Sequence, residues 1–153
     1  MSATASSALA AIRARLVADD SGVTIPLRWH GEPGDPLPDD PMPFGFVVFN
    51  NEGSGAGPTE FGGGRGQNRY RNNATVEAYV FVPAQSGLPL ALDLAEAVAS
   101  RLRSFRDDTV SCFSADVIPI GAGSSIAPPG LDSDVSNFVA ALAEVRVTFD
   151  QIG

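Results

Sequence analysis

The side chains of this sequence that could act as a nucleophile or a base are few. His30 is the only histidine and Cys112 the only cysteine, so any Ser–His or Cys–His pair has to use His30. His30 follows Trp29 and precedes a loop of Gly, Pro and acidic residues, which indicates a solvated residue at a strand end. Cys112 lies in an apolar segment with no local group that lowers a thiol pKa, as is typical of a buried structural cysteine. We therefore expect no catalytic residue and no enzyme activity.

Metal and phosphate sites are equally poorly supported. One His and one Cys cannot complete a closed zinc site. Residues 132–136, Asp-Ser-Asp-Val-Ser, have the first spacings of a calcium loop, but Asn137 and Ala143 stand where that loop needs Gly and Glu. The glycine-rich stretch 53–66 lacks the Lys of a phosphate-binding loop, and Glu60 replaces the third Gly of a dinucleotide fingerprint. We expect neither a metal nor a cofactor.

One basic cluster is present, formed by Arg65, Arg69 and Arg71, with Tyr70 between the last two. These four residues are the candidate site for a protein interface. Arg suits such a role because its planar guanidinium pairs bidentately with carboxylates. The alternative interpretation is a strand entrance at which the Arg side chains pair with nearby acids of the same chain.

Composition excludes several functions. The 153 residues include 18 acids against 10 basic residues, which gives a formal charge of −8, and all basic residues are Arg. This negative net charge disfavours binding to nucleic acid or to an anionic membrane surface. No apolar run approaches the roughly 20 residues that span a bilayer, and the N-terminus does not resemble a signal peptide. We expect a protein used in a cytoplasm or in a particle assembled there.

Hydrophobic periodicity predicts the elements of the first half of the chain. Residues 5–19 are expected to form a helix with a narrow apolar stripe. Residues 23–29 are expected to form a strand at a sheet edge, because Pro26 cannot donate to a ladder. A Pro-rich loop then leads to an apolar strand at residues 44–49. The Gly-rich residues 51–67 are expected to be a mobile loop without a core of its own.

The second half of the chain has a clearer periodicity of apolar and polar residues than the first half. Residues 69–83 predict a long strand that ends at Pro83, and residues 87–105 predict an amphipathic helix. A strand at 109–120 precedes a second flexible loop at 121–134. Residues 138–149 are expected to form the last strand, although the propensity of their first half also permits a helix. The order α-β-β-β-α-β-β predicts one α+β domain over residues 1–153, with two helices on a mostly antiparallel or mixed sheet of about five strands.

This pattern resembles the tail terminator proteins of long-tailed phages and of phage-derived particles such as gene transfer agents. The central part of the resemblance is the strand Tyr70–Pro83, followed by a Gly-bearing turn and the helix from Ala91 to Phe105. The leading helix, the Pro-rich loop before residues 44–49 and the closing strands around residues 110–113 and 143–149 also fit. The Gly-rich loop at 51–67 departs from the family pattern.

The resemblance implies a non-enzymatic virion protein. Members of that family form a homohexameric ring that caps the tail tube at its final length and joins it to the head connector, with assembly in the host cytoplasm. DNA passes through the ring without specific binding, and we expect acids rather than Arg to face its lumen. The partners implied are other copies of the chain, the tail tube protein and the head–tail connector protein. A head-completion or connector protein is the close alternative, and a small α+β enzyme or ligand-binding module is a more distant one.

Overall fold

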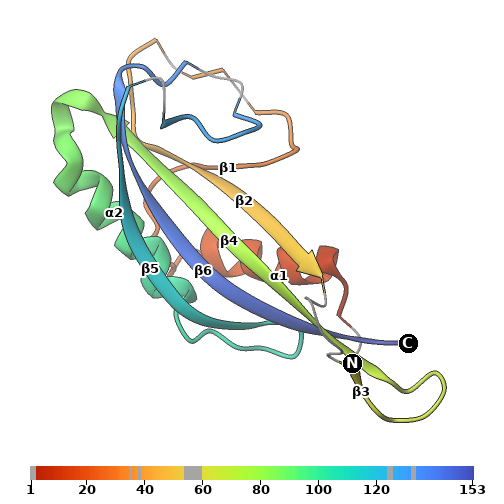
Figure 1. Ribbon diagram of the computed structural model, residues 1–153. Helices are drawn as coiled ribbons and strands as arrows, with labels where there is room; N and C mark the ends of the chain where they lie inside the picture. The colour runs from red at the N-terminus through yellow and green to blue at the C-terminus, as the bar shows by residue number, and fades with distance from the viewer. Residues whose placement is uncertain (1–2, 35, 38, 54–59, 124–125, 132–133) are drawn as a thin grey trace.

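The computed structural model describes residues 3–34, 36–37, 39–53, 60–123, 126–131 and 134–153. Within these ranges two α-helices pack on one face of a mixed β-sheet, so the α+β class predicted from the sequence is confirmed (Figure 1). The order of elements also agrees with the prediction, apart from an additional two-residue strand.

The sheet has the strand order β1-β2-β4-β6-β5, and the short β3 pairs with the outer part of β4. β1 runs parallel to β2, and every other pairing is antiparallel. The two longest strands, β4 and β6, therefore form the centre of the sheet. The bounds are β1 Leu27–Trp29, β2 Phe44–Gly53, β3 Glu60–Phe61, β4 Arg69–Pro83, β5 Ser111–Ala122 and β6 Phe138–Ile152.

Helix α1 spans Ala5–Val17 and begins at a capping box. The Thr4 hydroxyl accepts from the Ser7 amide, and the Ser7 hydroxyl accepts from the Thr4 amide, which satisfies two amides that the helix leaves unpaired. The helix ends two residues before the predicted limit because Ala18 is already extended and its carbonyl closes a turn with Ser21. Its buried stripe consists of Ala8, Ile12 and Leu16.

A 3-10 turn, η1 (Ala84–Ser86), leads from β4 into helix α2 (Gly87–Leu102). α2 packs on β4, β5 and β6 through a stripe of small side chains. It stops at Leu102 rather than at the predicted 105, because Arg103 already leaves the helical region with a ψ of 121° and Ser104 then adopts a positive φ of 59°. Its buried residues are Ala91, Ala95, Val98, Ala99 and Leu102.

Several predicted strand limits were wrong, because strand pairing in the sheet sets where each strand begins and ends. β1 begins only at Leu27, although it lies at the sheet edge as predicted and the preceding Pro26 carbonyl accepts from Gly45 at 2.8 Å. β5 continues through Pro119 to Ala122, which an edge strand permits because its outer side needs no donor. β6 is a single strand along its whole length, since pairing on both sides with β4 and β5 outweighs the helix propensity of residues 138–143.

The two faces of the sheet differ. The helices cover one face over the main core, in which alternate residues of β4 and β6 are buried. The opposite face has an apolar end formed by Phe44, Phe46, Phe81 and Phe138, which buried residues of the second loop cover. The other end of that face carries polar side chains, and the hollow that opens on it is lined, among the described residues, by residues of the strands alone. We call this end the uncovered face.

Beyond the helices, the sheet narrows into a projection that we call the arm. It consists of β3, the turn 62–68, the first residues of β4 (69–71), the last residues of β6 (150–152) and Gly153 (Figure 1). Asn68 and Gly153 exchange two backbone hydrogen bonds across it, at 3.2 and 3.0 Å. The prediction of a structureless loop at 51–67 was therefore wrong for its two ends, which lie in β2 and in the arm. Residues 54–59 lie outside the described residues.

Glycine at the tip of the arm has a steric reason. A Cβ built on Gly63 would lie 2.2 Å from the carbonyl oxygen of Gln67, and Gly64 has a positive φ of 85°. The turn closes through a hydrogen bond from Gln67 N to Gly64 O at 2.9 Å. The glycines of this segment thus permit a tight reversal of the chain rather than only a flexible one.

Candidate functional site

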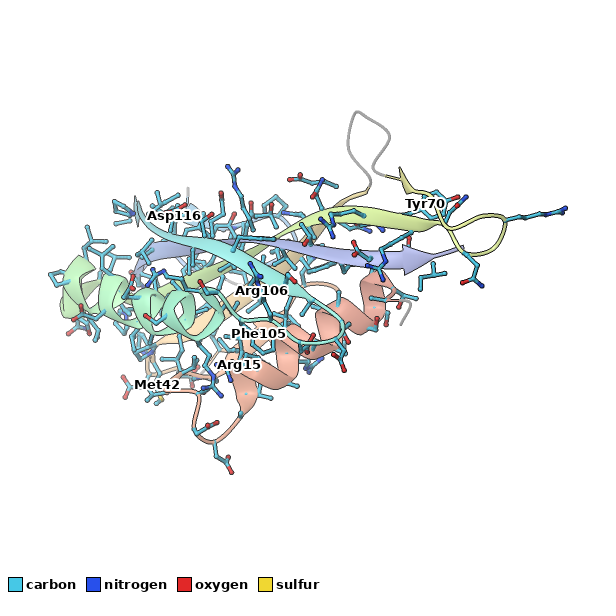
Figure 2. The ribbon with its side chains drawn as sticks, turned by 90° about the horizontal axis from the view of Figure 1, so that it is seen from below. Arg15, Met42, Tyr70, Phe105, Arg106 and Asp116 are labelled. Carbon is cyan, nitrogen blue, oxygen red and sulfur yellow. The ribbon has the colours of Figure 1, made fainter. Side chains whose placement is uncertain are left out.

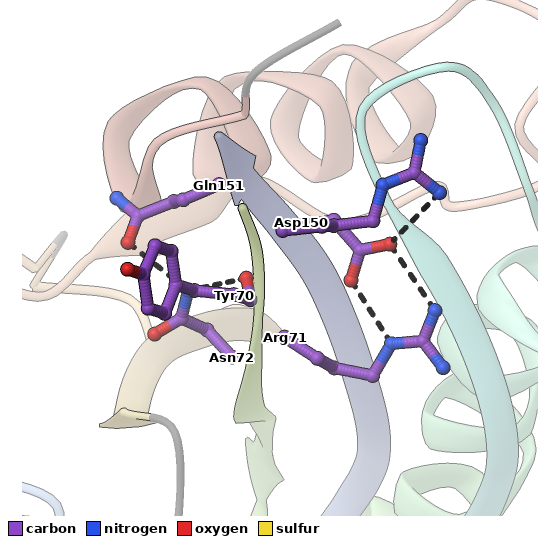
Figure 3. Close-up of polar contacts among 6 residues, drawn as sticks. Tyr70, Arg71, Asn72, Asp150 and Gln151 are labelled. Atoms are coloured by element: carbon purple, nitrogen blue, oxygen red, sulfur yellow. Dashed lines mark hydrogen bonds and ion pairs between the residues drawn. The ribbon is translucent and has the colours of Figure 1, made fainter. Parts of the chain in front are cut away.

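At the base of the arm, Arg71 and Asp150 lie opposite one another in the β4–β6 ladder. The Arg71 Nε and Nη2 donate to the two carboxylate oxygens of Asp150 at 2.9 and 3.1 Å, a bidentate pair (Figure 3). The hydrogen bond from Arg71 holds the pKa of the Asp150 carboxyl below its ordinary value. The same pair raises the pKa of Arg71. This residue of the predicted interface cluster therefore fixes the arm to β6 within one chain.

The other two arginines of the cluster point outward. Arg69 has 55% of its side chain exposed and reaches Asp150 only at 4.0 Å. Arg65 is exposed in the turn of the arm and forms no ion pair with any residue that the structure describes. The sequence thus grouped three arginines that the fold separates into one structural pair and two outward cations.

Tyr70 is the aromatic member of the predicted cluster and lies on the arm (Figure 2). It is 37% exposed. The neighbouring Asn72 is buried and donates to the Gln151 side chain at 3.1 Å and to the Tyr70 carbonyl at 3.4 Å (Figure 3). The arm is therefore held in shape by polar contacts on both sides of the ladder, and none of its described side chains belongs to the buried apolar core.

A second feature lies on the uncovered face, where three acids form a row across three strands. Glu77 of β4 lies opposite Glu144 of β6, and Glu144 lies opposite Asp116 of β5. We call these three residues the acid row. Directly paired residues point to the same face of a sheet, and their sequence neighbours Val76, Ala78 and Val145 are buried under the helices. The acid row therefore points away from the helices.

The electrostatics of this row are unfavourable within a single chain. Like charges directly opposite one another in a ladder destabilise it. Nothing in the described parts of the chain forms an ion pair with any of the three acids. The Tyr79 hydroxyl donates to Glu77 at 3.3 Å, and burial, followed by the charges of Glu77 and Glu144, raises the pKa of Tyr79. The face thus carries an excess of negative charge.

A hollow of about 580 Å³ lies beside the acid row on this face. Its described lining residues include one cation, Arg146, which lies opposite Thr75 in the ladder, and one exposed aromatic ring, Phe113. The hollow is open and its walls come from four strands, so its shape suits an extended segment better than a small enclosed ligand. Its lining residues are Asn50, Glu52, Asn73, Ala74, Thr75, Glu77, Phe113, Glu144, Arg146, Val147 and Thr148.

Sequence reasoning missed the acid row. Each of its members occupies a polar position in an alternating strand, which by itself indicates only a solvated face. Their adjacency depends on the register of β4, β6 and β5, and no local signal in the sequence specifies that register. The alternation of apolar and polar residues did show that the even-numbered residues of β4 form the buried face. It is therefore the signal that could have placed Glu77, an odd-numbered residue, on the opposite face.

The two candidate nucleophiles lie on opposite sides of the sheet. Cys112 is fully buried in the main core, and burial is the largest cause that raises its thiol pKa to about 12. His30 is exposed, with its ring against Gly130 and edge-on to Phe46 at 6.2 Å. Their placements match the solvated strand end and the buried thiol predicted from the sequence, and the sheet keeps them apart.

The weak calcium-loop pattern is only partly described. Asp134 accepts a hydrogen bond from the Ser136 amide at 2.9 Å, which lowers the pKa of its carboxyl, whereas Asp132 lies outside the described residues. Over the described ranges, no group of three or more His, Cys, Asp and Glu residues is placed to hold a metal ion. Within the same ranges, no helix is both long and apolar enough to cross a membrane.

No protein-family model matches this sequence, and no curated protein matches it significantly.

Proposed function

We propose that this chain is a structural subunit of a phage-type tail, a tail terminator that assembles as a ring at the end of the tail tube and joins it to the head connector. The observation that carries this proposal is the arm. It extends the two central strands beyond the helices, and ladder and polar contacts hold its shape. A projection of this kind gains contacts when it meets another subunit, as interface segments commonly do.

The charge of the chain supports a ring through which DNA passes. The formal charge is −8 per subunit, so a ring of several copies presents strong negative charge. DNA phosphates are held by clustered Lys and Arg. Several arginines of this chain already form ion pairs with acids of the same chain, among them Arg71, Arg101 and Arg103. The proposed location is the head–tail junction of the virion.

The first test is the solution mass. A tail terminator ring is expected near six times the subunit mass of 15.9 kDa, whether it forms alone or on the tip of a tail tube. A stable monomer whose melting temperature rises with a small molecule would instead favour a ligand-binding module, since binding to the native state alone stabilises it.

The decisive test is deletion of the gene followed by electron microscopy of the particles. Overlong or headless tails are expected if the chain terminates the tube. Empty heads beside tails of normal length would assign the chain to the head connector instead. Particles that are unchanged in both respects would refute a role in tail assembly.

A further inference from the structure

We propose that the arm of one copy docks on the uncovered face of the next copy, where Arg65 and Arg69 neutralise the acid row. This inference rests on the proposed ring and specifies the contact that closes it. The occupant is a second copy of this chain, and the reasons lie in the charge of the face, the charge of the arm and the continuity of the strand that joins them.

The uncovered face requires a cationic partner. The acid row places three carboxylates side by side without a pairing cation among the described residues. Such a row costs folding free energy in the isolated chain. The hollow beside it is open, is lined from four strands and carries the exposed ring of Phe113. An arriving extended segment that carries cations would complement both the charge and the open shape of this face.

The arm has that chemistry. Arg71 is already paired with Asp150, which leaves Arg69 more than half exposed and Arg65 exposed in the turn. Tyr70 is partly exposed on the same projection but, as the next residue of β4, points to the opposite face from Arg69, so the contact is assigned to the arginines. Arginine guanidinium groups pair bidentately with carboxylates, and their charge is independent of pH in the physiological range.

A chain cannot satisfy its own acid row with its own arm. Arg69 and Glu77 belong to the single continuous strand β4, so at about 3.3 Å per residue they are separated by roughly 26 Å. Strand β4 is paired with β6 along the whole of this stretch, and with β3 or β2 on its other side at every residue except Arg71 and Asn72, so it cannot fold back. The contact must therefore join different copies. Because the arm and the face are different surfaces, the contact is head-to-tail, and such a contact gives a ring when the rotation between successive copies closes.

The test uses two double variants of the full chain. The arm variant is Arg65→Glu/Arg69→Glu, and the face variant is Glu77→Arg/Glu144→Arg. Each alone is expected to weaken association at least about tenfold, as reversal of a charge at a complementary interface does. Assembly is measured by sedimentation velocity and native mass spectrometry, and raising the salt concentration is expected to weaken the wild-type contact.

Two combinations separate docking from damage to the fold. In a mixture of the two variants, the arm of a face variant meets the face of an arm variant with the original charges, and the arm of an arm variant meets the face of a face variant with both charges reversed. Both contacts are complementary, so the mixture should recover rings in which the two variants alternate. The chain that carries all four reversals has complementary charges again and should recover the ring. A matched control, Asp19→Arg/Asp93→Arg, makes the same charge change at two exposed acids near or on the helices and should assemble like the wild type.

The docking would be overturned if both double variants formed rings as stable as those of the wild type. The uncovered face would then face the channel of the ring or the solvent. A wild-type chain that stays monomeric at high concentration in low salt would also overturn it, because both surfaces are preformed. Neither result bears on the proposed function, which is tested separately by microscopy of particles from the gene deletion.

Discussion

Glu77 in β4 and Glu144 in β6 lie directly opposite one another in the antiparallel ladder, on the face of the sheet that the helices leave open. Asp116 continues the row on β5. The main core on the other face is conventional, with small and branched side chains under two helices. The unusual feature of this fold is thus an uncompensated negative row in the middle of a sheet, and it leads to the first prediction.

Replacing the central acid should stabilise the isolated subunit. Glu144→Gln removes the charge that faces both Glu77 and Asp116, and we expect a gain of about 0.5 kcal/mol in the free energy of unfolding, the usual scale of a cross-strand pair. Urea unfolding of dilute protein measures the change. Asp93→Asn, at an exposed acid on α2, is the matched control and should leave the stability unchanged. Loss of stability in Glu144→Gln would show that the row is compensated.

The Arg71–Asp150 pair should make the stability depend on pH in acid. The Asp150 pKa is below its ordinary value of 3.8 in the folded chain, so the pair stabilises the fold above that pH. Its contribution is lost as pH falls from about 4 through the lower folded pKa. We expect Asp150→Asn to cost up to about 1 kcal/mol at neutral pH and progressively less below pH 4. A cost that persists undiminished at pH 2 would assign it to packing instead.

The Cys112 thiol should be inert in the native protein. Burial raises its pKa to about 12, so at pH 8 almost no thiolate is present and no reagent reaches it. Modification by a thiol reagent is expected only as the chain unfolds, at a rate that rises with denaturant. Rapid stoichiometric labelling under native conditions would contradict the buried placement of this residue.

The turn of the arm should depend on Gly63 in particular. A Cβ on Gly63 would collide with the Gln67 carbonyl oxygen, whereas one on Gly62 would meet no atom within 4 Å. We expect Gly63→Ala to open the turn, weaken ring assembly and leave the melting temperature almost unchanged, because no described side chain of the arm belongs to the apolar core. Gly62→Ala is the matched control and should assemble normally. Equal behaviour of the two variants would mean that the shape of the turn does not matter.

Much of the fold could be predicted from the sequence, because it depends on patterns that repeat within one segment. The alternation in residues 69–83 identified β4 with its observed limits, and the apolar stripe of residues 87–105 identified α2. The α+β class followed from the order of such segments. The helix ends were less accurate, since Ala18 and Arg103 leave the helical region through backbone conformations that hydrophobic periodicity does not record.

The candidate site required the tertiary structure. The sequence by itself determined which residues carry charge and which positions of each strand share a face. Only strand register decided that Glu77, Glu144 and Asp116 form a row, and that Arg71 pairs with Asp150 while Arg65 does not. The reason is physical: the face of a strand is set by local geometry, whereas the neighbour across a ladder comes from a distant segment and is selected by the packing of the whole sheet.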